Sequence, residues 1–200
     1  MSNEALVMSL YKHKGIIEFL GVSVDKIPMI VMEYCVGGSL DLHLQRFKGH
    51  IRTAERIRYL LEISNGMRYL ERKQCVHRDL TTRNIPIRWM APESLTRNPV
   101  YSVKSDMWSF GVVIYEIMRK YKEKLPKCSL SWRVTPELPR RIPRLLRELV
   151  IACFQRDPTR RPSFKHMSGR LLLIQSLRFP SPDPRLLTLS QIKNVVVSLI

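Results

Sequence analysis

The residues best suited to chemistry lie together at positions 77–84, which read HRDLTTRN. A carboxylate (Asp79), a guanidinium (Arg83) and an amide (Asn84) follow one another within six residues. A carboxylate within hydrogen-bond reach of a hydroxyl can accept its proton, and a neighbouring cation can offset developing negative charge. An isolated HRD could also be a solvated loop without a chemical role, so the flanking segments decide between the two interpretations.

Two segments with helical patterns must hold this stretch in place. Residues 52–72 repeat apolar side chains at spacings of three and four, with charged residues between them, which predicts a helix that ends just before the stretch. Residues 106–119 are apolar almost all round, which is typical of a helix buried at the centre of a domain. Both flanking segments therefore favour a chemical role for residues 77–84 over a solvated loop.

The N-terminal part of the chain predicts a helix and a hairpin. Residues 3–12 carry one apolar helical face, and two runs rich in apolar and β-branched residues, 16–24 and 27–34, predict strands joined by a tight turn. A Gly-Gly-Ser sequence then interrupts the pattern, and Ser39 is a candidate N-cap for a further helix.

The C-terminal part predicts two more helices and two irregular segments. Residues 144–155 and 163–177 have amphipathic spacing, whereas residues 120–143 are basic, contain four prolines and predict a loop. A proline-rich linker and an apolar tail make up residues 178–200. The tail is either a cover for exposed surface or out-of-frame sequence, and the pattern does not choose between these.

The composition is that of a globular domain with a strongly basic surface. The chain has 200 residues, is 44% hydrophobic and carries a net charge of +17. Such a charge indicates a solvated cationic surface or an anionic partner, but no zinc-finger spacing or dense lysine run is present, so nucleic acid is not expected. The four cysteines form no C-x-x-C pair, and neither a signal peptide nor an apolar run of about 20 residues occurs, so we expect a cytoplasmic protein without a transmembrane segment.

Residues 77–84 resemble the catalytic loop of protein kinases, H-R-D-L-x-x-x-N. In that family the aspartate accepts the proton of the attacking hydroxyl, and the asparagine holds a magnesium ion beside the nucleotide. The resemblance implies catalytic roles for Asp79 and Arg83, a metal-binding and cofactor-binding role for Asn84, a structural role for His77, and ATP and Mg²⁺ as cofactors.

Other segments resemble further motifs of the same family. The sequence from Glu33 to Cys35, followed by Gly-Gly-Ser-Leu, is similar to the hinge, where backbone groups of these two residues would bond adenine behind Met32 as gatekeeper. An Ala-Pro-Glu motif ends at Glu93, and Arg161 resembles the arginine that pairs with this glutamate.

Three details resemble tyrosine kinases, while the Met32 gatekeeper, the Gly-Gly-Ser sequence and the short catalytic-loop variant are similar to the cytoplasmic Fes/Fer group. Position 81 is threonine, where serine/threonine kinases usually carry a lysine, and Arg83 stands four residues after the catalytic aspartate. Residues 85–93 are similar to the platform that receives a substrate tyrosine. The resemblance therefore implies a tyrosine-containing protein as substrate.

Some of these residues are better interpreted as structural. A buried carboxylate at the start of a helix, Asp106, is expected to accept backbone N–H bonds from the catalytic loop. Glu93 and Arg161 are expected to form a partly buried ion pair that holds the platform and takes no part in the chemistry. Glu4 resembles the glutamate of the family's C-helix and is expected to be structural as well.

Two parts of the family pattern are missing. Only residues 85–90 separate Asn84 from the Ala-Pro-Glu motif, and no Asp-Phe-Gly occurs anywhere in the chain. The glycine-rich loop and the lysine that would pair with Glu4 are not found either. Because phosphoryl transfer needs metal ions that bridge the phosphates, we expect weak ATP binding and no useful turnover.

The sequence thus predicts an α+β, protein-kinase-like fold that consists mostly of the helical C-lobe. Residues 1–35 are expected to be a remnant of the N-lobe, residues 36–177 the helical lobe, and residues 178–200 a segment outside the fold. Three hypotheses remain: a shortened tyrosine kinase with impaired activity, a non-catalytic pseudokinase that binds proteins, and, least favoured, a basic nucleic-acid binder.

Overall fold

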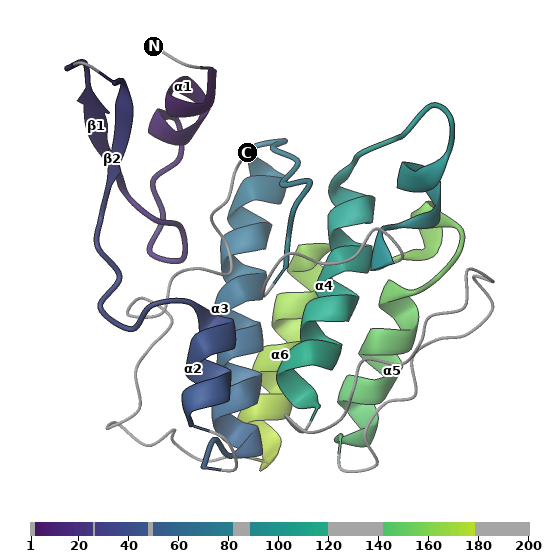
Figure 1. Cartoon of the computed structure of the whole chain (residues 1–200). Coiled ribbons are helices and arrows are strands. Elements are labelled where there is room, and N and C mark those ends of the chain that lie inside the picture. The colour runs from purple at the N-terminus through teal and green to yellow at the C-terminus, as the bar shows by residue number, and fades with distance from the viewer. Residues whose placement is uncertain (1–2, 26, 48–49, 82–88, 120–141, 179–200) are drawn as a thin grey trace.

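The structure is a computed structural model that describes residues 3–25, 27–47, 50–81, 89–119 and 142–178. A small hairpin and one short helix stand beside a group of longer helices (Figure 1). This arrangement confirms the predicted α+β class with a mostly helical lobe. In chain order the elements are α1 (Asn3–Ser9), β1 (Phe19–Ser23), β2 (Met29–Met32), α2 (Leu40–Arg46), α3 (Thr53–Arg72), the 3-10 helix η2 (Pro92–Leu95), α4 (Val103–Met118), α5 (Arg144–Cys153), the 3-10 helix η3 (Pro158–Arg160) and α6 (Phe164–Arg178).

The two strands pair antiparallel but are shorter than predicted. The first was expected over residues 16–24, yet Ile16 and Ile17 are only 3% and 6% exposed, and Ile16 belongs to the helical core. These side chains pack inward ahead of the strand, so regular pairing starts only at Phe19, and a bulge follows directly. The paired residues are Phe19 with Met32, Gly21 with Val31, Val22 with Ile30, and Ser23 with Met29.

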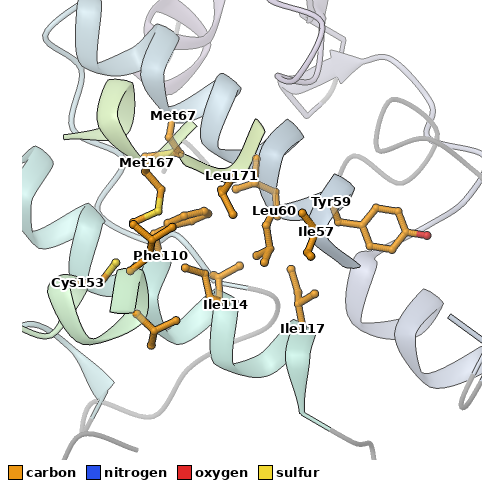
Figure 2. Packing of buried hydrophobic residues seen from close by; sticks show 14 of the residues in the cluster. Ile57, Tyr59, Leu60, Met67, Phe110, Ile114, Ile117, Cys153, Met167 and Leu171 are labelled. Atoms are coloured by element: carbon orange, nitrogen blue, oxygen red, sulfur yellow. The ribbon is translucent and has the colours of Figure 1, made fainter. Parts of the chain in front are cut away.

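The core lies between α3, α4, α5 and α6. The predicted apolar face of α3 is buried there, and Figure 2 shows how side chains of these helices converge. Helix α4 is central, because 13 of its residues are buried, which is why its sequence has no polar face. Residues at the middle of this cluster include Leu60, Met67, Phe110, Ile114, Met167 and Leu171.

Helix α4 begins earlier than its apolar pattern indicates. The predicted start was residue 106, but the helix starts at Val103 because Ser102 caps it. The Ser102 hydroxyl accepts the N–H groups of Lys104 (3.1 Å) and Ser105 (3.3 Å), and the Ser105 hydroxyl accepts the Ser102 N–H (2.8 Å). This reciprocal cap fixes the first turn and places Asp106 inside it.

A single carboxylate links the end of α3 to the start of α6. The two oxygens of Glu71 accept the backbone N–H groups of Phe164 and Lys165, each at 3.2 Å. These N–H groups have no partner inside their own helix, so Glu71 satisfies them and complements the helix dipole.

Candidate active site

The catalytic-loop segment leaves α3 through a tight C-terminal turn. Gln74 adopts a left-handed conformation with φ of 56°, and the Cys75 N–H donates to the Leu70 carbonyl at 3.0 Å. This turn ends the helix and directs the chain toward His77, which is buried.

Asp106 binds the backbone of this loop with both carboxylate oxygens. The N–H of His77 donates to Oδ2 at 2.8 Å, and the N–H of Arg78 donates to Oδ1 at 2.9 Å. Arg78 has φ of 70°, a left-handed conformation that is uncommon for a residue with a side chain. The two hydrogen bonds compensate for this backbone conformation and fix the direction in which the next residue, Asp79, leaves the loop.

The buried position of Asp106 shifts its ionisation. Its side chain is 1% exposed, and desolvation raises its pKa from 3.8 to about 6, although the hydrogen bonds from His77 and Arg78 and the charge of Arg78 act in the opposite direction. Asp106 therefore uses both oxygens to bind the loop backbone and is buried, whereas Asp79 is exposed.

Asp79 is the exposed carboxylate of the loop. Its neighbour Leu80 is fully buried, and its own N–H donates to the Nδ1 atom of His77 at 3.3 Å. Partial desolvation raises the pKa of the Asp79 carboxyl. The loop thus presents a carboxylate to solvent between two buried anchors, which is the geometry that a proton acceptor requires.

Several predicted site residues lie outside the described part of the chain. Arg83 and Asn84 are among them, together with residues 85–88 of the substrate platform. For Glu4 the backbone belongs to α1, and nothing further is described of its side chain. The roles expected for these residues stay predictions.

Glu93, the last residue of the platform segment, forms an ion pair with Arg161. The two guanidinium NH groups of Arg161 donate to the two carboxylate oxygens of Glu93 at 2.6 and 2.9 Å. The other N–H bonds of Arg161 go to the carbonyls of Gln155 (2.8 Å), Lys104 (2.8 Å) and Arg156 (3.4 Å). All five guanidinium donors therefore have an acceptor, which explains how a fully buried arginine is accommodated.

Aromatic side chains complete the surroundings of this pair. The guanidinium of Arg161 lies 5.0 Å from the ring centroid of Trp108, and the Trp108 indole N–H donates to the Trp89 carbonyl at 3.0 Å. Trp89 stacks in turn on Tyr115, with ring centroids 6.2 Å apart. The platform segment is thereby fixed to α4 at Trp89.

The predicted hinge is tied to the start of β1. The Glu33 N–H donates to the Glu18 carbonyl, and the Glu18 N–H donates to Oε1 of Glu33, both at 2.9 Å. Two residues on, the Cys35 carbonyl accepts the Gly38 N–H at 3.0 Å, and Gly38 has φ of 66°. Ser39 precedes α2 as predicted, but its hydroxyl bonds to Asp41 and not to a helix N–H.

Two contributors to the site were not anticipated. Arg78 places its guanidinium 5.7 Å from the ring centroid of Tyr101, so this tyrosine orients the arginine that precedes Asp79. The Ser102–Ser105 cap positions Asp106. The spacing of these two serines, three residues apart before an apolar run, is a recognisable cap signal, whereas the contact of Arg78 with Tyr101 has no local signal.

The described residues do not supply a complete magnesium site. No cluster of three or more His, Cys, Asp or Glu side chains occurs in the part of the chain that the structure describes. Asp106 accepts backbone N–H groups, which leaves Asp79 as the exposed carboxylate of the loop. Mg²⁺ is held by one or two carboxylates together with substrate phosphates and water, so the described residues provide only part of such a site.

The fold and the site together define a kinase-like helical lobe with its catalytic-loop aspartate exposed. The chain matches the family model "Protein tyrosine and serine/threonine kinase" over residues 1–87 and 85–171, and it belongs to this family. The two matched pieces meet directly after the catalytic loop, where the sequence lacks Asp-Phe-Gly.

The relatives of the chain include several tyrosine kinases. Fer-related kinase 1 of Caenorhabditis elegans is 35% identical, over 62% of this chain and 39% of the relative. Megakaryocyte-associated tyrosine-protein kinase of Rattus norvegicus is 31% identical, over 84% and 44%, and tyrosine-protein kinase Fer of Homo sapiens is 27% identical, over 86% and 26%. The predicted resemblance to the Fes/Fer group is confirmed, and the chain spans less than half the length of each of these relatives.

No described helix has the length and apolar character needed to cross a membrane. The cysteines in the described residues, Cys35, Cys75 and Cys153, are free thiols. Burial raises the pKa of the Cys153 thiol, which suits a core side chain better than a reactive one.

Proposed function

We propose that this chain is a tyrosine-kinase-type domain that does not transfer phosphate at a useful rate and that acts by binding other proteins. The observation that carries the proposal is the short junction between the catalytic loop and the Ala-Pro-Glu motif. Residues 85–90 leave no room for an Asp-Phe-Gly segment. The aspartate that would hold the metal ions is therefore missing from the interior of the matched region.

Some of the residues that phosphoryl transfer would need are nevertheless present. Asp79 is held by the bonds of Asp106 to the loop, so it could accept the proton of a substrate tyrosine hydroxyl. Arg83 would offset charge on the transferred group, and the backbones of Glu33 and Cys35 would meet adenine. Bound ATP with Mg²⁺ would supply the phosphoryl group, but Asn84 by itself is an incomplete metal site.

Calorimetric titration of the full chain with Mg-ATP tests the absence of catalysis. We expect no saturable binding in the micromolar range and no labelled phosphate on a tyrosine-containing polypeptide. A micromolar dissociation constant would contradict the expected weak ATP binding. Phosphoryl transfer that disappears in Asp79→Asn would show that the chain is an active tyrosine kinase and would overturn the proposal. Protein binding that is equal in wild type and Asp79→Asn supports the binding role, and loss of it in a folded Asp79→Asn variant contradicts that role.

A second candidate is a shortened product of a gene that also encodes a complete tyrosine kinase. The direct succession of the two matched pieces favours it, because gradual decay would leave altered residues and not a clean junction. Sequencing full-length transcripts tests this candidate: a reading frame with Asp-Phe-Gly after Asn84 supports it, and transcripts with only the short junction exclude it. A cytoplasmic location and a protein, not a nucleic-acid, partner are part of both candidates.

A further inference from the structure

The loop between α1 and β1 is anchored on the last turns of α3. The imidazole of His13 stacks on the ring of Tyr69, with centroids 5.0 Å apart and planes inclined by 18°. The Lys12 N–H donates to the Tyr69 hydroxyl at 3.2 Å, and the ring of Tyr11 meets the same tyrosine edge-on at 6.5 Å. Three successive residues thus contact one side chain of α3.

Hydrogen bonds inside this loop fix its shape. The Gly15 N–H donates to Nδ1 of His13 at 3.1 Å, and the Ile16 N–H donates to the His13 carbonyl at 2.9 Å. A Cβ atom at Gly15 would lie 3.5 Å from the Cα of Gly66, so the loop runs close to the α3 backbone. Because Nδ1 accepts a hydrogen bond, the proton of the neutral ring is on Nε2, which can donate to a ligand.

This arrangement gathers basic side chains around the His13–Tyr69 stack. Lys14 follows His13 directly, and Arg72 and Lys73 stand three and four residues after Tyr69, on the same side of α3. All three are exposed, and none forms an ion pair with a carboxylate that the structure describes.

Glu71, which directly precedes Arg72 in the sequence, does not neutralise these cations. Both oxygens of Glu71 accept backbone N–H groups at the start of α6. Burial lowers the pKa of His13, and the charges of Lys14 and Arg72 lower it further. The negative end of the α3 dipole offsets part of this repulsion, which makes the cluster tolerable without an anion.

We propose that His13, Lys14 and Arg72, with Lys73 beside them, form a binding site for a phosphomonoester on a partner protein. The set provides a forked guanidinium at the end of α3, and an ammonium and an Nε2–H donor on the loop anchored to it, which suits a compact dianion. The set shares no residue with the candidate active site, so the proposal does not rest on nucleotide binding.

A membrane surface is a less suitable partner. Peripheral membrane sites combine basic residues with apolar side chains that insert beside them. The most exposed apolar residues of the hairpin, Val24 (84%) and Ile27 (71%), are at its turn, at the opposite end of β1 from residues 11–15 (Figure 1). The basic cluster therefore lies away from these two side chains, and the exposed apolar residue nearest to it in the sequence is Leu10 (63%).

Nuclear magnetic resonance of the full chain with labelled histidine tests the site. The probes are N-acetyl-phosphotyrosine amide, N-acetyl-phosphoserine amide and unphosphorylated N-acetyl-tyrosine amide. We expect saturable shifts of the His13 imidazole with the two phosphorylated probes only, and about tenfold weaker binding in Lys14→Gln and in Arg72→Gln, the change that corresponds to one charge-assisted hydrogen bond.

Lys12→Gln is the matched control, because Lys12 is in the same loop but is paired with Glu18 at 2.8 Å. Its affinity should equal that of the wild type. Shifts that occur equally with the unphosphorylated probe, that stay unchanged in both charge variants, or that never saturate would overturn the proposal. So would binding to phosphatidylserine vesicles that depends on Lys14 and Arg72 while the soluble phosphomonoesters cause no shift. Failure of this proposal can be distinguished from failure of the proposed function, because the Mg-ATP titration reports on the candidate active site.

Discussion

The hairpin region and the helical region of this chain differ in how completely their side chains are buried. In the hairpin region, Leu20 is 61% exposed and Met29 is 56% exposed, although both lie on strands. In the helical region, Leu60 and Phe110 are fully buried. A two-stranded hairpin is marginally stable alone, so the N-terminal remnant depends on its few inward contacts, whereas the helices possess a core of their own.

A buried ion pair of the helical region differs from the exposed ion pair of the hairpin region. Arg161 and Glu93 pair inside the protein with every guanidinium donor bonded, while Lys12 and Glu18 pair at the surface, with side chains 87% and 45% exposed. A buried pair becomes costly once one partner is removed, but an exposed pair contributes little. The Arg161–Glu93 pair is therefore expected to matter more for stability than the Lys12–Glu18 pair.

Removal of Arg161 should have the largest effect. Arg161→Met leaves Glu93 partly buried without its partner and three carbonyls without their donor, so unfolding should become easier by about 3–5 kcal/mol. Urea denaturation followed by circular dichroism measures this change. Lys12→Met is the surface counterpart and should leave the urea midpoint unchanged; equal shifts for the two variants would remove the distinction between the regions.

The next effect concerns pH and Asp106. Its carboxyl has a pKa of 3.8 when unperturbed and about 6 in the folded chain, so between these values the folded state binds a proton that the unfolded state has released. Its contribution to stability is therefore full below pH 3.8 and is lost as the pH rises to 6, by up to about 3 kcal/mol.

Asp106→Asn cannot titrate and provides the reference for this measurement. We expect the stability difference between wild type and Asp106→Asn to decrease from pH 4 to pH 6 and to stay constant above pH 7, as measured by urea unfolding at each pH. A difference that is independent of pH would show that this carboxyl does not ionise in that range.

A third test concerns the contact between α4 and α5. A Cβ atom at Gly111 would lie 2.7 Å from the Cβ of Cys153, so Gly111→Ala should destabilise the chain by about 1–3 kcal/mol through overpacking. Gly169 in α6 has no atom within 4 Å of such a Cβ, and Gly169→Ala should stabilise by up to about 1 kcal/mol. Thermal unfolding of both variants measures the opposite signs, and a shared sign would contradict the packing described for α4.

The smallest change is expected in the hairpin. Leu20→Thr removes a side chain that is 61% exposed and keeps a residue suited to a strand, so global stability should change by less than about 0.5 kcal/mol. Leu60→Ala in the core should destabilise by about 2–5 kcal/mol under the same urea assay. A loss above about 1 kcal/mol for Leu20→Thr would indicate that the hairpin belongs to the main cooperative unit.

Helices were easier to predict than strands. The repeats in α3, α5 and α6 reflect a buried face, so their existence and approximate bounds follow from periodicity. The strands were placed too broadly because Ile16 and Ile17 look like strand residues but pack inward before the strand begins. The start of α4 was misplaced because the apolar pattern hides the polar cap at Ser102.

The candidate site was predictable where its residues form a motif. Motif spacing was sufficient to predict the Glu93–Arg161 pair, while the role that it assigns to Asp79 stays a prediction. Contacts between distant segments carry no such signal: nothing near Tyr101 in the sequence indicates Arg78, and nothing near His13 indicates Tyr69. These pairs arise only from the packing of whole elements.

The carboxylate of Glu71 has a consequence for the order of folding. Its bonds to Phe164 and Lys165 join residues 93 and 94 positions apart in the sequence. Such a link requires the closure of a long loop, and the N-terminal partner is synthesised well before the other. On the ribosome, the last turn of α3, and with it the segment leading to His77, would wait for α6 to emerge. A nascent chain that stops before α6 would therefore leave the catalytic-loop end of α3 without its link to α6.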